Sequence, residues 1–99
     1  MSEPRPAALR AVVRGRVQGV GFRDYVLTRA SFLGLSGYVR NLPDYRSLEI
    51  VAEGDRPDLE QLLAYLREGP RGSRVDSVET EWGERTGDYS GFGVGYVRS

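Results

Sequence analysis

The stretch GRVQGVGFR, residues 15–23, joins two segments whose apolar residues recur with different periods, and it therefore determines the first elements of the predicted fold. Between Leu9 and Val17, apolar residues alternate with arginines, which is the period of a half-buried strand. From Phe22 to about Leu35, apolar residues recur at helical spacing, and Gly34 can close the helix. The stretch therefore predicts a glycine-rich loop between a strand and a helix.

Such a loop suits an anion, and phosphate above all. Glycines such as Gly19 and Gly21 have no Cβ, so the backbone can turn its N–H groups inward, and the following helix adds unpaired donors and a positive dipole end. Arg23, at the helix start, can hold two phosphate oxygens through parallel hydrogen bonds. The alternative is an ordinary connection with a solvated arginine, since the loop lacks both the third glycine of a dinucleotide fingerprint and the Gly-Lys-Ser/Thr of a nucleoside-triphosphate loop.

Asn41 is the only asparagine in the chain and ends a short segment, Gly37 to Asn41, that reads as a strand. Asparagine commonly starts turns by bonding its own backbone, and the residues alone favour that role here. Its amide also carries a donor and an acceptor, which is what holding a water molecule against a phosphorus atom requires.

The rest of the chain predicts an α+β domain. A turn at 42–46 leads to a strand from Ser47 to Glu53, and a leucine stripe then marks a helix that Gly69-Pro70 ends. Val75 to Trp82 reads as an exposed strand, 83–91 as a loop, and Phe92, Val94 and Tyr96 as a last strand. The order βαββαβ plus an extra strand predicts a ferredoxin-like split βαβ sandwich, an antiparallel sheet with two helices on one face.

Composition excludes several kinds of chemistry. The chain has 99 residues without cysteine, histidine or lysine, so thiolate nucleophiles, imidazole bases, Schiff bases and nitrogen–sulfur metal sites are not available from it. Its net charge is zero, so no overall field favours nucleic acid or an anionic membrane. We expect a cytoplasmic protein with a flexible segment at residues 1–7 and a single domain at 8–99.

The aromatic last strand admits a second interpretation. Phe92, Val94 and Tyr96 share a face and could stack on bases, as in RNA-recognition motifs of this fold class. A core role is favoured, because the segment lies at the end of the chain and no basic surplus supports nucleic-acid binding.

Residues 15–23 together with Gly37-Tyr38-Val39-Arg40-Asn41 closely resemble the acylphosphatase family. The resemblance extends through Ala52-Glu53-Gly54 and the leucine-striped helix to the last strand, and one departure is the turn after Asp44, which is one residue longer and has Tyr45 in place of a glycine. It implies metal-independent hydrolysis of an acyl phosphate to a carboxylate and phosphate, without a cofactor. By resemblance, Arg23 binds phosphate and Asn41 orients water. The resemblance likewise implies a phosphate cradle made of five backbone amides, those of Gln18, Gly19, Val20, Gly21 and Phe22.

This chemistry explains the missing histidine. The leaving carboxylate has a conjugate acid of pKa about 4, so no protein acid is needed to protonate it, and positioning and electrostatics suffice. We expect a monomer whose partner is a small-molecule acyl phosphate of unspecified acyl group, with no nucleic acid and no membrane. The alternative from another class is a binding module without turnover, either an RNA binder on the same fold or a phosphate sensor.

Overall fold

A computed structural model describes residues 5–95 of the chain. Within them the elements follow the predicted order βαββαβ with one extra strand. They are β1 (Pro6–Arg16), α1 (Phe22–Phe32), β2 (Ser36–Asn41), β3 (Ser47–Asp55), α2 (Arg56–Glu68), β4 (Arg74–Gly83) and β5 (Phe92–Val94).

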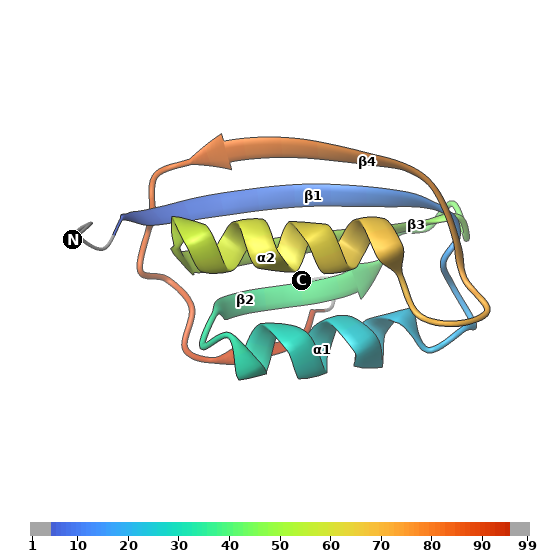
Figure 1. The fold of residues 1–99 in the computed structure, drawn as a ribbon, viewed down its shortest axis with the longest axis horizontal. Coiled ribbons are helices and arrows are strands. Elements are labelled where there is room, and N and C mark those ends of the chain that lie inside the picture. Colours follow the sequence, from blue (N-terminus) through green and yellow to red (C-terminus); the bar gives the residue numbers. More distant parts are fainter. Residues whose placement is uncertain (1–4, 96–99) are drawn as a thin grey trace.

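The strands form one sheet in the order β4-β1-β3-β2-β5, with both helices on the same face (Figure 1). The pairs β1–β3, β1–β4 and β2–β3 are antiparallel, but β5 pairs with β2 in parallel, with Val39 opposite Val94. The expectation of a purely antiparallel sheet was therefore wrong at one edge. The chain leaves β4 at one edge and reaches the opposite edge through residues 84–91, so β5 enters in the direction of β2.

The core lies between the sheet and the two helices. Alternate residues of β1 face it, and α1 and α2 each contribute one apolar stripe, as the two periodicities of the sequence predict. The fully buried members include Leu9, Ala11 and Val13 of β1, Phe22, Val26 and Ala30 of α1, and Leu59, Leu62 and Leu66 of α2.

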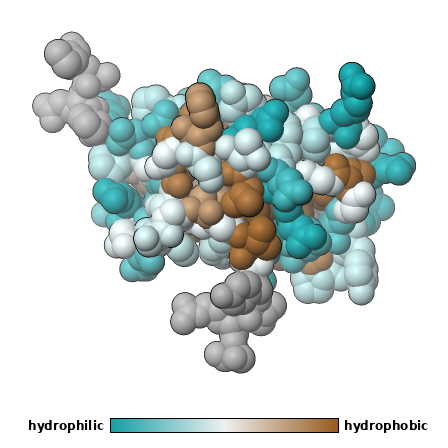
Figure 2. Space-filling model, turned by 90° about the horizontal axis from the view of Figure 1, so that it is seen from below, coloured by the Kyte–Doolittle hydropathy of each residue, from teal (hydrophilic) through white to brown (hydrophobic). Residues whose placement is uncertain are grey.

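The helix α1 ends at Phe32, three residues before the expected limit near Leu35. Gly34 adopts a positive φ of 73°, and its N–H donates to the Ser31 carbonyl while that of Leu35 donates to Ala30, so the last carbonyls are satisfied by a glycine-dependent cap. Phe32 is 87% exposed. Figure 2, seen from the α1 side, shows a band of apolar side chains across the middle and a smaller apolar patch among hydrophilic side chains towards the right-hand end, where α1 begins in Figure 1.

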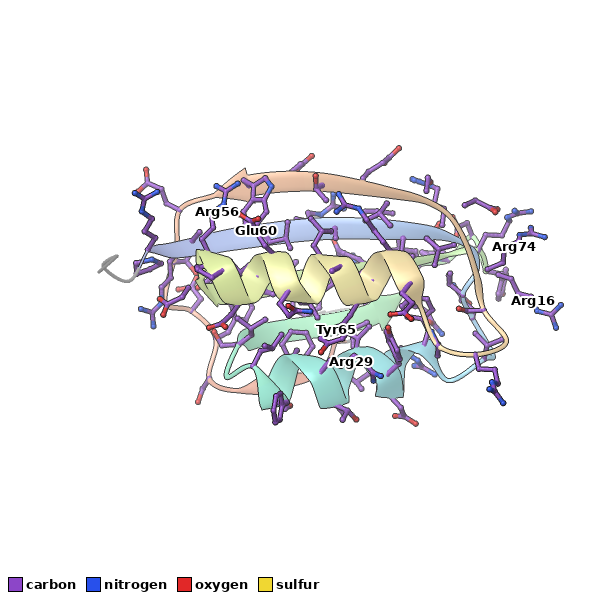
Figure 3. The ribbon with its side chains drawn as sticks, viewed as in Figure 1. Arg16, Arg29, Arg56, Glu60, Tyr65 and Arg74 are labelled. Carbon is purple, nitrogen blue, oxygen red and sulfur yellow. The ribbon has the colours of Figure 1, made fainter. Side chains whose placement is uncertain are left out.

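Side chains between the helices fix where α1 begins relative to the sheet. The Tyr25 hydroxyl donates a 2.8 Å hydrogen bond to the Tyr65 carbonyl on α2, and burial raises the pKa of that hydroxyl. The Arg29 guanidinium lies 3.7 Å from the centre of the Tyr25 ring and 5.1 Å from that of Tyr65 (Figure 3). These contacts connect the two helices beside the first turn of α1.

The start of β1 differs from the expected domain boundary. Pro6 and Ala7 pair with Asp55 and Gly54, although both fall in the segment 1–7 that the sequence predicts to be flexible. Residues 1–4 lie outside the described part of the chain, as does Tyr96 of the expected last strand. No helix within residues 5–95 has the length and apolar character needed to span a membrane.

Candidate functional site

The loop between β1 and α1 presents backbone donors without partners. Gly19 and Gly21 adopt φ values of 75° and 79°, a region that residues with a Cβ rarely enter. A Cβ at either position would meet no atom within 4 Å, so these glycines are needed for backbone conformation and not for close packing. None of the N–H groups of residues 18–22 donates to another group in residues 5–95. The loop thus offers an array of free amides at the N-terminus of α1.

Arg23 stands in the first turn of α1, beside these amides. Its side chain is exposed and forms no ion pair or hydrogen bond with any other residue of the described range 5–95. A guanidinium without a carboxylate partner, next to a helix N-terminus, produces a locally positive site on a chain of zero net charge.

A hollow of about 290 Å³ opens at this end of the sheet. It brings together Arg23 and Asn41, which are 18 positions apart in the sequence, and it is near the small end of the range of about 300–1,000 Å³ for small-molecule sites. Its lining residues are Val17, Gly19, Gly21, Phe22, Arg23, Asp24, Asn41 and Val94.

Asn41 reaches the hollow from the last position of β2, opposite Leu48 of β3. Its Oδ1 atom is buried and accepts no hydrogen bond from any group in residues 5–95. A buried amide oxygen without a partner is uncommon, because leaving it unpaired costs about 1–3 kcal/mol. In a turn former that oxygen would bond the local backbone, so the observed geometry favours a role toward a guest in the hollow over the turn-forming role.

Two residues of the expected phosphate cradle do not line the hollow. Val20 packs partly against the core, and the Gln18 side chain turns away to the connection between β2 and β3. Asp24 and Val94 do line it, and sequence reasoning had assigned neither to the site. Asp24 could have been found from its place next to Arg23, whereas Val94 arrives through the non-local pairing of β5 with β2.

The turn after Asn41 holds a residue other than glycine in a conformation that favours glycine. Tyr45 has a φ of 62°, the left-handed region where a glycine is expected, and its side chain is 84% exposed. The Asp44 carboxylate accepts hydrogen bonds from the Ser47 hydroxyl at 2.6 Å and the Arg46 N–H at 2.9 Å, which hold the pKa of Asp44 below its ordinary value. The turn is therefore ordered by polar contacts despite the missing glycine.

Of the two described residues that were expected to belong to the core from the last strand, one does so. Phe92 packs partly against the core, while Val94 is 43% exposed at the rim of the hollow. Within residues 5–95, no group of three or more His, Cys, Asp or Glu side chains is arranged to hold a metal ion.

Comparison with known proteins gives one consistent result. The family model "Acylphosphatase" matches residues 9–94. A protein named acylphosphatase from Thermus thermophilus is 54% identical over 86 residues, covering 87% of this chain and 96% of that one, and one from Dehalococcoides mccartyi is 49% identical over the same length, covering 87% and 94%. The crystal structure of acylphosphatase from Bacillus subtilis superposes with a TM-score of 0.86 at 33% identity, covering 91% of this chain and 99% of that one.

Proposed function

The chain belongs to the acylphosphatase family and hydrolyses acyl phosphates, and we propose that Arg23, Asn41 and the amides of residues 18–22 carry out that reaction. The observation that carries the proposal is the hollow itself. It joins an unpaired guanidinium, free loop amides and an unpartnered amide oxygen in a space of about 290 Å³.

The phosphoryl group of the substrate occupies the end of the hollow formed by the loop. Its oxygens accept hydrogen bonds from the amides of the loop, and Arg23 binds two of them through its fork of N–H groups. These donors stabilise the negative charge on the phosphoryl oxygens as the bond to the acyl oxygen lengthens. Because the donors are fixed by the loop and by α1, little reorganisation accompanies the reaction.

Asn41 holds the attacking water on the other side of the phosphorus. Its Oδ1 accepts a hydrogen bond from the water, which directs an oxygen lone pair at the phosphorus and away from the amide. The bond from phosphorus to the acyl oxygen breaks as the bond to water forms, and the electron pair leaves with the carboxylate. A phosphoryl oxygen accepts the proton of the water, so the reaction needs no imidazole.

Hydrolysis of benzoyl phosphate in the presence of a chelator tests these assignments. Removing one preorganised transition-state donor costs about 10²–10³ in rate, so Arg23→Ala is expected to lose at least that much while remaining folded. Arg67→Ala, at an exposed position in the last turn of α2, serves as the matched control and should keep the rate of the wild-type protein. A nearly normal rate for Arg23→Ala refutes the role of Arg23.

The Asn41→Ala variant separates water orientation from binding. A group that orients water acts mainly in the transition state, so kcat should fall while KM for benzoyl phosphate changes little. A rise in KM with unchanged kcat refutes this role. A salt-sensitive shift of RNA with no turnover by the wild-type protein would favour a binding module instead.

We extend the proposal to the setting of the reaction. We infer a monomer acting on a small-molecule acyl phosphate, as the sequence predicts. A cytoplasmic location and a single domain at 8–99 remain predictions from the sequence, and so does the flexible segment before it, of which Pro6 and Ala7 are part of β1.

A further inference from the structure

The Gln18 side chain links the two halves of the site without entering it. Its amide nitrogen donates one hydrogen bond to the Leu42 carbonyl at 3.0 Å and another to the Ser47 carbonyl at 2.9 Å. Gln18 itself belongs to the loop between β1 and α1, and the two acceptors lie 24 and 29 positions further along the chain. The contact therefore joins the phosphate loop to the connection between β2 and β3.

The two carbonyls stand on opposite sides of that connection. Leu42 directly follows Asn41, and Ser47 is the first residue of β3. The Leu42 N–H also donates to the Ser47 carbonyl at 2.9 Å, so this hydrogen bond closes the base of the turn. A carboxamide nitrogen has two hydrogens, and Gln18 uses both of them to hold the first and last residues of the turn at once.

Asn41 needs such support because the turn beyond it is strained. Tyr45 stands in the left-handed region, which costs a residue with a Cβ about 1–2 kcal/mol. Asp44 stabilises the far side of the turn through Arg46 and Ser47, but neither contact touches the residue next to Asn41. Among the side chains of residues 5–95, that of Gln18 alone donates a hydrogen bond to the Leu42 carbonyl.

We propose that Gln18 is a positioning residue, whose side chain fixes Asn41 relative to the phosphate loop so that the attacking water and the phosphorus stand in line. This inference rests on the proposed function, and it assigns to the side chain a role separate from that of the Gln18 backbone amide. Since the backbone of Gln18 belongs to the loop and its side chain donates to the residue that follows Asn41, a shift of either half is transmitted to the other.

Gln18→Met tests the inference, because the methionine side chain has a similar length but no N–H donor. Outer-shell contacts that orient metal ligands contribute about 10–100-fold, and by analogy we expect kcat for benzoyl phosphate to fall by roughly tenfold. KM and inhibition by inorganic phosphate should change little, since the backbone amide and Arg23 remain in place. Gln61→Met is the matched control, because Gln61 is exposed on α2 and is the other glutamine of the chain. It should leave kcat unchanged.

A double-mutant cycle with Asn41→Ala decides whether Gln18 acts through Asn41. If it does, Gln18→Met should cause no further loss of kcat in the Asn41→Ala background, because there is no longer an amide to position. An equal loss in both backgrounds overturns the inference. So does a marked weakening of phosphate inhibition in Gln18→Met with kcat unchanged, which would mean that Gln18 shapes only the loop.

A spectroscopic measurement keeps the inference testable apart from activity. Asn41 is the only asparagine, so its side-chain NH₂ pair is readily assigned in an ¹⁵N-resolved NMR spectrum once the two glutamines are substituted in turn. We expect this pair to shift in Gln18→Met and to stay in place in Gln61→Met, and an unshifted pair in folded Gln18→Met overturns the inference. If Gln18→Met does not fold, Gln18→Glu repeats both measurements with a side chain of the same size that lacks the donors.

The failure of the inference and that of the proposed function give different results. A wild-type rate in Asn41→Ala refutes the proposed role of Asn41 and, with it, any positioning by Gln18. A wild-type rate in Gln18→Met beside a slow Asn41→Ala overturns the inference alone.

Discussion

Glu53 holds the crossover that brings β5 to the site, so its removal should destabilise the protein measurably. Glu53 is 2% exposed, and its carboxylate accepts hydrogen bonds from the Thr86 hydroxyl at 2.7 Å, the Thr86 N–H at 3.1 Å and the Gly87 N–H at 3.0 Å. Thr86 and Gly87 lie in the segment 84–91, which connects β4 to β5. A single carboxylate on β3 thus fixes the one connection that crosses from edge to edge of the sheet.

The size of the effect follows from these three donors. A hydrogen bond to an ionised group contributes about 1.5–3 kcal/mol, but the segment 84–91 is exposed, so water can replace part of what the donors lose. The Glu53→Ala variant also has no carboxylate to desolvate on folding, which reduces the net loss of stability. We therefore expect the free energy of unfolding to fall by about 2 kcal/mol, and by about 1 kcal/mol for Thr86→Ala, which keeps both backbone donors.

Urea unfolding followed by the fluorescence of Trp82, the only tryptophan, measures this loss. Trp82 lies next to the end of β4 and is partly buried, and the Arg56 guanidinium lies 3.9 Å from the centre of its ring, so its environment changes on unfolding. Glu84→Ala, at an exposed position with no hydrogen bond to another side chain in residues 5–95, is the control. A loss below about 0.5 kcal/mol for Glu53→Ala, the usual range of surface substitutions, would refute the proposed anchoring of the crossover.

The pH dependence of the same loss gives an independent test. Burial raises the pKa of Glu53, but the hydrogen bonds from Thr86 and Gly87 outweigh burial and hold the pKa below its ordinary value. A carboxylate with a lowered folded pKa stabilises the protein above the unfolded pKa of about 4.3, and this contribution is lost as the pH falls through the folded pKa. The difference between wild type and Glu53→Ala should therefore be largest near neutral pH and shrink in acid, and a difference that grows in acid contradicts the assignment.

Three further substitutions are expected to change the free energy of unfolding, each measured by urea titration. Gly37→Ala should be strongly destabilising, because its Cβ would lie 1.9 Å from the Val51 carbonyl oxygen, whereas Gly83→Ala meets nothing within 4 Å and should be nearly neutral. Tyr45→Gly should stabilise by about 0.5–1 kcal/mol, since the strain at φ 62° is relieved and the exposed ring loses no packing. Glu49→Ala should cost about 1–2 kcal/mol, because it removes the buried carboxylate that accepts from Arg40 at 2.6 Å and Arg10 at 2.7 Å, while water can solvate the two partly exposed guanidiniums.

Local patterns predicted most of the fold. The switch from alternating to helical periodicity around residues 15–23 places the loop between β1 and α1 correctly, and the leucine stripe places α2. Asn41 and Arg23 do meet at one hollow, as the family resemblance implies. The loop and α2 depend on residues that are neighbours in the sequence, which a single chain shows, whereas the meeting of Arg23 and Asn41 was expected from the family resemblance alone.

The parts that the sequence did not predict depend on contacts between distant residues. The parallel pairing of β5 with β2 requires the crossover, which is anchored by a carboxylate 33 positions before Thr86. Nothing in the local pattern of Glu53 distinguishes it from an exposed strand residue. The contacts of the Gln18 side chain could not be predicted for a similar reason. Its acceptors are backbone carbonyls of a turn, and any residue type supplies a carbonyl.

The selectivity of the hollow for an anion must come from local pairing of charges, because the chain has 14 basic and 14 acidic residues. Many arginines of the described range are matched by a carboxylate. The pairs are Arg10 and Arg40 with Glu49, Arg14 with Glu79, Arg46 and Arg74 with Asp76, and Arg56 with Glu60. The field of a matched pair fades quickly with distance, and salt screens exposed charges beyond about 8 Å. Several arginines of the described range have no such partner, but among them only Arg23 lines the hollow beside the free loop amides, at the proposed phosphoryl site. A site of this kind recognises the phosphoryl group strongly and places few electrostatic demands on the acyl group attached to it.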